Sequence, residues 1–291
     1  MNADTLTDGA RSTPPPGLGE RSFTVRFLFL PALSLLSGLA LTGCPHGNVV
    51  RPYPEPTAQE ILQHLRSLRD RAPSLNAETR TDVRLGSDRV NVKVQMLAAW
   101  GGKLRFQALD PNETMAADLA SDGKRYCLID VHANCGECGP ATPETVARLV
   151  RIPLQPDEVV AVLLGTAPVI DGDTTDVWDA SEGREIVTIK SGGRSERLVL
   201  AGGAGKSWDL LEAELDEDGK KMWSVRHKDF HDVPAPGGVV RLPGASLFEQ
   251  GGDTVRILWR EQKVGAAIPD SKFGLEVQPG LPDCRTKRSV R

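Results

Sequence analysis

Residues 90–108 read VNVKVQMLAAWGGKLRFQA, and the expected architecture follows from their spacing. Apolar side chains occupy every second position from Val90 to Met96, and the alternation resumes at Leu104 and Phe106. A period of two predicts half-buried β-strands, one on each side of a glycine pair. Because the connection is so short, the two strands must be antiparallel neighbours, since parallel pairing requires a long crossover.

The same alternation recurs on both sides of this pair, interrupted by tight turns. The expected strands cover 76–85, 90–96, 104–108, 114–120, 124–130, 174–179, 185–190, 194–200, 207–215, 220–229 and 253–260. About 11 strands that follow one another through short turns favour an α+β fold with one large, strongly curved antiparallel sheet.

Three helices are expected on the concave face of this sheet. Thr57 and Glu60 form a capping box ahead of a leucine-rich stripe, which predicts a helix over 58–70. A second helix begins at Pro143, and a third follows over 156–164. The third is apolar nearly all round, so we expect it to be enclosed rather than solvent-facing.

Composition limits the classes of partner. The chain has 291 residues, 40% of them hydrophobic and 25% charged, with a formal net charge of −4. This composition is typical of a globular protein and gives no electrostatic reason to expect a nucleic-acid partner. We expect a monomer.

The amino terminus predicts a secretory signal. Residues 27–41 form an uncharged apolar run of 15, which is too short for a membrane span of about 20 residues. The run ends in Leu41-Thr42-Gly43-Cys44, which resembles a bacterial lipobox with Cys44 as the acylated residue. We therefore expect a signal peptide over 1–43, of which 1–24 is interpreted as a mis-assigned start.

The mature chain is then expected to be held by lipid at Cys44. A Pro-rich tether would cover 44–56, and one sheet domain would cover 57–291. Pro45 follows the cysteine where aspartate would favour inner-membrane retention in enteric bacteria. We therefore expect a periplasm-facing protein anchored to the outer membrane.

The element order and several short motifs resemble the bacterial lipoprotein-carrier superfamily, the LolA/LolB-like group. The motifs lie at 103–106, 122–123, 152–154, 162–168 and 268–273. The resemblance implies an incomplete barrel whose apolar concave face is covered by helices that shift to admit acyl chains. It implies a lipid or an acylated lipoprotein as partner. We expect neither enzymatic activity nor a cofactor, because the sequence carries no catalytic signature.

On that interpretation a set of apolar side chains lines the cavity. These are Val92, Val94, Met96, Leu104, Phe106, Leu119, Val160, Leu163 and Leu164. The same residues would fill a solid core equally well. The alternative is therefore a structural or envelope-assembly lipoprotein that acts through protein–protein contacts, and a hydrolase or redox enzyme is a third, weaker hypothesis.

Four cysteines besides Cys44 lie in what we expect to be an oxidising compartment, which favours disulfides. Of three possible pairings, we expect Cys135–Cys138 and Cys127–Cys284. Zinc binding by Cys127, His132, Cys135 and Cys138 is the alternative. A reactive dithiol is disfavoured, because the next helix begins five residues beyond Cys138.

The remaining motifs do not indicate catalysis. The glycine-rich stretch 201–207 has Leu200 where a phosphate loop requires glycine, so we interpret it as a hairpin turn. His227 and His231 fall in or near a strand, which separates them by about 13 Å, and we expect both to be solvated. No catalytic residue, metal ligand or cofactor is predicted.

Overall fold

The computed structural model describes residues 48–150, 152, 154–203 and 207–288. The predicted signal peptide and Cys44 lie outside these residues. The described strands are Ser74–Leu85 (β1), Asp88–Ala99 (β2), Lys103–Leu109 (β3), Met115–Asp122 (β4), Arg125–Asp130 (β5), Cys135–Pro140 (β6), Asp173–Asp179 (β7), Arg184–Ser191 (β8), Arg194–Gly203 (β9), Ser207–Glu217 (β10), Lys220–Lys228 (β11), His231–Ala235 (β12), Gly238–Leu242 (β13), Ala245–Gln250 (β14) and Asp253–Val264 (β15).

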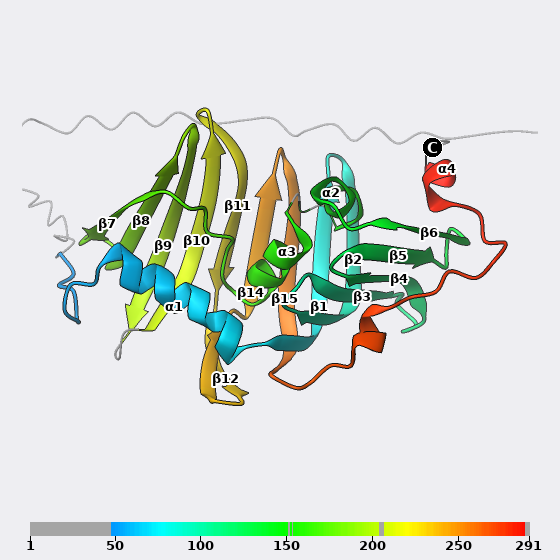
Figure 1. Ribbon diagram of the computed structural model, residues 1–291, viewed down its shortest axis with the longest axis horizontal. Helices are drawn as coiled ribbons and strands as arrows, with labels where there is room; N and C mark the ends of the chain where they lie inside the picture. The colour runs from blue at the N-terminus through cyan, green and yellow to red at the C-terminus, as the bar shows by residue number, and fades with distance from the viewer. Residues whose placement is uncertain (1–47, 151, 153, 204–206, 289–291) are drawn as a thin grey trace, which may run out of the picture. The chain divides into compact units, whose positions relative to one another are not determined.

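Thirteen of these strands form one open antiparallel sheet (Figure 1). Their order is β6, β5, β4, β3, β2, β1, β15, β14, β11, β10, β9, β8 and β7. The sheet is strongly curved: β7–β11 run nearly at right angles to β3–β6 in the view of Figure 1. The curved antiparallel sheet is thus confirmed, with more strands than the 11 expected.

The chain between β6 and β7 must cross the whole sheet, because those strands are its two edges. It crosses on the concave face and forms two short helices there, Pro143–Val150 (α2) and Pro156–Leu163 (α3) (Figure 1). Every side chain of α3 from Val159 to Leu163 is buried. Gly165 ends this segment with a φ of 79°, a backbone conformation that favours glycine.

The longest helix, Ala58–Arg71 (α1), covers the other half of the concave face, across β7–β10 (Figure 1). The capping box between Thr57 and Glu60 is present. Ile61, Leu62 and Leu65 are buried along one stripe of the helix. The apolar stripe therefore has the packing role that its 3.6-residue spacing predicted.

Four strands were not expected from the sequence. β6 and β14 belong to the main sheet, whereas β12 and β13 form a separate hairpin. β6 has the sequence CGECGP, in which no apolar alternation exists. Its position at the sheet edge comes from backbone pairing with β5, from two disulfides and from the carboxyl-terminal segment, with which Gly136 forms a parallel bridge at Asp283.

The predicted disulfide pairing is wrong. Cys127 is bonded to Cys138, and Cys135 is bonded to Cys284. Cys127 and Cys138 stand directly opposite each other on β5 and β6, so cross-strand register decides the first bond. The second joins β6 to the short carboxyl-terminal helix Cys284–Arg288 (α4).

His227 is also placed differently from the expectation that it is solvated. It lies on β11 with Trp223 and Val225 on the inward face and is fully buried. Its Nδ1 lies 2.9 Å from the Ser246 hydroxyl, and its Nε2 lies 3.4 Å from the carbonyl oxygen of Thr166. Burial lowers the pKa of His227 to about 4, so the side chain is a neutral core residue. His231 is exposed, as expected.

Candidate functional site

An apolar hollow of about 250 Å³ lies between the concave face of the sheet and the crossing helices. Its sheet side comes from β15 and β1–β5, and its cover comes from α2, α3 and the segment between them. The lining residues are Thr81, Val83, Val92, Val94, Met96, Phe106, Ala108, Ala117, Leu119, Leu128, Asp130, Leu149, Ile152, Val159, Leu163, Val255 and Ile257.

Strand alternation builds the sheet side of the hollow. Val92, Val94 and Met96 point inward from β2, because successive strand residues face opposite sides. Met96 stands opposite Phe106 of β3, and Phe106 stands opposite Leu119 of β4. Cross-strand register therefore gathers side chains from three strands into one continuous apolar surface.

Helix periodicity builds the cover. Val159 and Leu163 of α3 are four residues apart, so they share one face, and both line the hollow. Val160 and Leu164 are fully buried, yet neither lines it. They lie outside the hollow, in contrast to the expectation for these two residues, because the helix is enclosed on more than one side.

Six of the nine predicted cavity residues line the hollow, and Leu104 lines a space of about 20 Å³ that shares Phe106 and Leu119 with it. That any of them contacts a ligand stays a prediction. Val255 and Ile257 of β15 were not predicted, and they reach the site because β15 pairs with β1. Leu149, the contribution of α2, was not predicted either.

The polar lining is sparse. Thr81 is buried, and its hydroxyl lies 3.1 Å from that of Thr79. Asp130 accepts a hydrogen bond from the Ala133 N–H at 2.8 Å. Neither lysine, arginine nor histidine is among the described residues that line the hollow. The site therefore offers burial to an apolar group and no cation to an anionic one.

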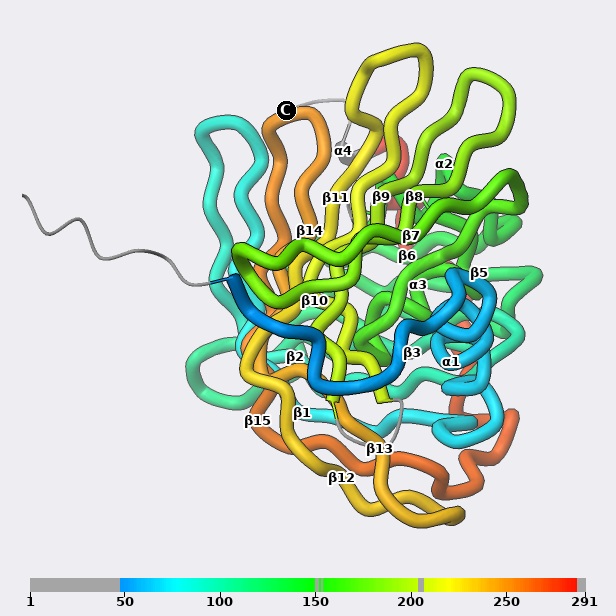
Figure 2. The backbone as a smooth tube through the Cα atoms, turned by 90° about the vertical axis from the view of Figure 1, so that its left-hand side faces the viewer, coloured from blue at the N-terminus to red at the C-terminus, as the bar shows by residue number. Residues whose placement is uncertain are grey.

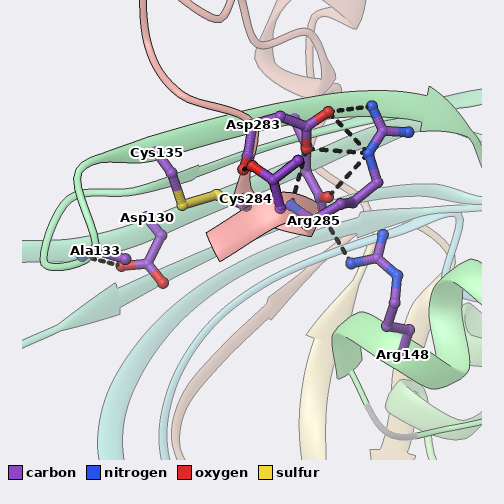
Figure 3. Close-up of a disulfide and its surroundings, with 9 residues drawn as sticks. Asp130, Ala133, Cys135, Arg148, Asp283, Cys284 and Arg285 are labelled. Carbon is purple, nitrogen blue, oxygen red and sulfur yellow. Dashed lines mark hydrogen bonds and ion pairs between the residues drawn. A yellow bond between two sulfur atoms is a disulfide. The ribbon is translucent and has the colours of Figure 1, made fainter. Parts of the chain in front are cut away.

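An ion pair holds α2 to the sheet edge beside the hollow (Figure 3). Arg148 of α2 donates to the buried carboxylate of Glu137 on β6 at 2.7 Å and to the Tyr126 hydroxyl at 2.8 Å. Arg285 of α4 lies 3.7 Å from the other carboxylate oxygen of Glu137. Figure 3 shows Arg148 and Arg285 on the same side of the sheet edge as the Cys135–Cys284 disulfide.

Other chemistry finds little support in the geometry. Cys127, Cys135, Cys138 and Cys284 are all in disulfides, so none of them is a thiolate ligand as the structure stands. The described part of the chain contains no cluster of three metal-ligating side chains. The strands β9 and β10 pair on both sides of residues 204–206, as the hairpin interpretation of 201–207 requires. Within the described ranges, no helix is long and apolar enough to cross a membrane.

Comparison with known proteins gives matches among solved structures. No family profile matches the chain, and no curated protein matches it. A LolA superfamily protein from Nitrosomonas europaea is similar over 76% of this chain and 99% of its own, at 12% identity and a TM-score of 0.48. A DUF1329 family protein from Desulfovibrio piger is similar over 76% of this chain and 98% of its own, at 11% identity and a TM-score of 0.48. These likenesses concern the fold alone and name no ligand.

Proposed function

We propose that this chain is a lipid-anchored envelope protein that binds an acyl chain of a lipid or lipoprotein in the apolar hollow. The observation that carries the proposal is the lining: apart from Thr81 and Asp130, every described residue that lines the hollow is apolar. Binding of a hydrocarbon chain to such a surface is favourable because it removes apolar surface from water. The surface gives little selectivity through hydrogen bonds.

The volume limits what enters without rearrangement. Pockets for drug-sized ligands occupy roughly 300–1,000 Å³, and the hollow measures about 250 Å³. In this conformation it accommodates part of one slender chain rather than a multi-chain lipid. A larger ligand requires the cover of the hollow to move outward, and movement of α2 would break the contacts of Arg148 with Glu137 and Tyr126.

The charge at the hollow favours a particular head group. Asp130 is the one carboxylate among the described lining residues. A carboxylate there repels a free fatty acid or a phosphate ester and tolerates an amide, hydroxyl or amine. An amide-linked or ester-linked acyl group, as in a lipoprotein, fits this arrangement better than a free fatty acid.

The position of the protein is proposed with the ligand. The lipobox resemblance supports acylation at Cys44, and Pro45 supports the outer membrane, with the domain facing the periplasm as a monomer. In a role in lipoprotein localisation, the anchor would hold the protein at the outer membrane and the hollow would bind the acyl chain of the lipoprotein. The proposed chemistry is binding, without catalysis or a cofactor.

A hollow-filling variant tests the proposal. Ala108 and Ala117 are cross-strand partners that both line the hollow, so A108F places a ring inside it. Leu97 lies on the opposite face of β2, and L97F is the matched control. Lipids and acyl peptides that co-purify with the full chain are identified by mass spectrometry.

We expect acyl species with the wild type and L97F, and their loss with A108F. Because each buried methylene contributes about 0.8 kcal/mol, affinity should rise roughly fourfold per carbon until the hollow is full. If no acyl species co-purifies, and if the affinity for added acyl peptides does not depend on the length of the acyl chain, the filled-core alternative that acts through protein contacts is supported instead.

A further inference from the structure

The segment before α1, residues 49–56, lies on the sheet, although the sequence predicted a tether for residues 44–56. The Val49 N–H donates to the Ala180 carbonyl at 2.7 Å, and the Trp178 indole N–H donates to the Val49 carbonyl at 3.1 Å. Pro56, at the other end of the segment, is buried. The segment therefore continues the cover that α1 gives to β7–β10, as the blue trace in Figure 2 shows.

An ion pair fixes the middle of this segment. Arg51 donates to both carboxylate oxygens of Glu185, at 2.8 and 3.1 Å, and the Glu185 side chain is fully buried. The Arg51 guanidinium also lies 5.1 Å from the Trp178 ring centroid. A buried carboxylate is costly without its partner, so undocking this segment carries a large penalty.

Tyr53 adds a second, aromatic attachment. Its ring meets Trp178 and Trp208 edge-on, with centroids 6.2 Å apart in each case. A Cβ on Gly202 would lie 1.9 Å from the Tyr53 hydroxyl, so this position requires glycine. Burial and the nearby Glu185 carboxylate raise the pKa of Tyr53 to about 12.

Docking shortens the connection to the predicted anchor. From Cys44 to Thr57 a free chain of 13 residues would reach about 45 Å, whereas from Cys44 to the docked Val49 five residues reach about 17 Å. The corner at the β7–β8 turn is thereby held close to any membrane that holds Cys44.

We infer that this corner, residues 48–50 and 177–183, is the surface of the protein that rests on the lipid bilayer. This inference depends on the anchor in the proposed function. Val50 is 84% exposed and Val177 59% exposed, the two highest values among the large apolar side chains of the described residues. Glu182 on the β7–β8 turn and Glu55 on the docked segment are exposed, so the corner suits a zwitterionic bilayer rather than an anionic one.

The orientation places the hollow away from the anchor. The docked segment covers β7–β10, and the hollow lies beneath β15 and β1–β5. β15, the nearest strand that lines the hollow, is six positions from β7 in the sheet, about 29 Å along its surface. That separation exceeds the reach of the shortened tether.

Photo-crosslinking tests the inference with the full acylated chain. The probe is a phosphatidylethanolamine with a photoreactive head group, in vesicles of phosphatidylethanolamine and phosphatidylcholine, and labelled peptides are mapped by mass spectrometry. We expect labelling in 48–50 and 177–183, and its loss in V50S/V177S. V90S/V239S is the matched control, since these valines are 54% and 58% exposed elsewhere, and it should keep the labelling.

A second variant tests the ion pair between Arg51 and Glu185 that fixes the docked segment. R51Q/E185Q removes both charges without leaving either one buried and unpaired. Only the two hydrogen bonds of Val49 then hold the segment ahead of Tyr53, and their release puts about 30 Å of chain between Cys44 and Tyr53. We expect labelling to spread beyond the corner. The pair Arg226–Glu249 is exposed at 2.7 Å on β11 and β14, and R226Q/E249Q should label like the wild type.

The outcomes separate the two proposals. If the chain carries no acyl group and does not float with vesicles, the anchor in the proposed function fails and this inference falls with it. If the chain floats but is labelled mainly at Val90 or Val239, or evenly over its surface, the inference fails and the anchor stands.

Discussion

Glu196 is a buried carboxylate whose surroundings do not neutralise it. One of its oxygens accepts the Ile170 N–H at 2.8 Å, and the other has no hydrogen-bond partner. Burial raises its pKa to about 7, opposed by the Ile170 hydrogen bond and by Arg194, while Glu158 adds to the increase. The Glu196 side chain thus holds the segment between α3 and β7 on the sheet, and its burial there makes the carboxyl group harder to ionise.

This carboxylate predicts a pH-dependent stability. Between pH 4.5 and 7 Glu196 keeps its proton in the folded chain and loses it in the unfolded chain, so the free energy of unfolding falls as pH rises through that window. The difference between a pKa of 4.5 in the unfolded chain and about 7 in the folded chain corresponds to about 3 kcal/mol. E196Q still accepts the Ile170 hydrogen bond, and we expect it to be more stable by about that amount at pH 8 and no different near pH 4.

Urea unfolding of both proteins at several pH values measures this difference. E249Q serves as the control, because Glu249 is not buried. A stability gain of E196Q that stays constant from pH 4 to pH 8 would contradict the assignment.

At the scale of elements, the periodicity of the sequence predicted which side chains of a strand or helix face inward. It did not predict which strands that are distant in the chain pair with each other. The inward set of β2 and β3 followed from residues 90–108. His227 continues the alternation of Trp223 and Val225, so extending that pattern by one step would have predicted its burial. Val255 and Ile257 reach the hollow only through the β1–β15 pairing, about 170 residues apart in the chain, and no local spacing encodes that register.

α2 is the element whose movement would enlarge the hollow. It contributes Leu149 to the lining, and Arg148 fixes it to Glu137 and Tyr126. Hydrogen bonds to charged groups contribute about 1.5–3 kcal/mol each, so the loss of both should raise local opening by roughly a hundredfold or more. We expect E137Q/R148M, which leaves no unpaired buried charge, to increase amide exchange in 143–150 by that factor.

Hydrogen–deuterium exchange with mass spectrometry measures this, with β2 peptides as the internal reference. R226Q/E249Q, which removes an exposed ion pair from β11 and β14, should leave exchange in α2 unchanged. Equal increases in α2 and β2 would show that the ion pair stabilises the whole domain instead of holding one helix.

At the scale of the whole molecule, one disulfide closes most of the fold. Cys135 and Cys284 are 149 residues apart in sequence, so their bond encloses α2, α3 and every strand from β7 to β15. Cys127 and Cys138 are 11 residues apart and close only the β5–β6 hairpin. A longer closed loop removes more entropy from the unfolded chain, which by the loop-closure relation gives about 5 kcal/mol for the first bond and about 3 kcal/mol for the second.

The tail that the longer loop retains also packs against the sheet edge. The Gly136 N–H donates to the Pro282 carbonyl at 2.9 Å, and a Cβ on Gly136 would lie 2.4 Å from Val277. We therefore expect C135S/C284S to lose about 2 kcal/mol more stability than C127S/C138S and to expose the edge of β6. Urea unfolding gives the first result, and limited proteolysis after residue 265 gives the second. If the two variants lose equal stability, the tail adds nothing beyond the hairpin, and β6 holds its edge by pairing with β5 alone.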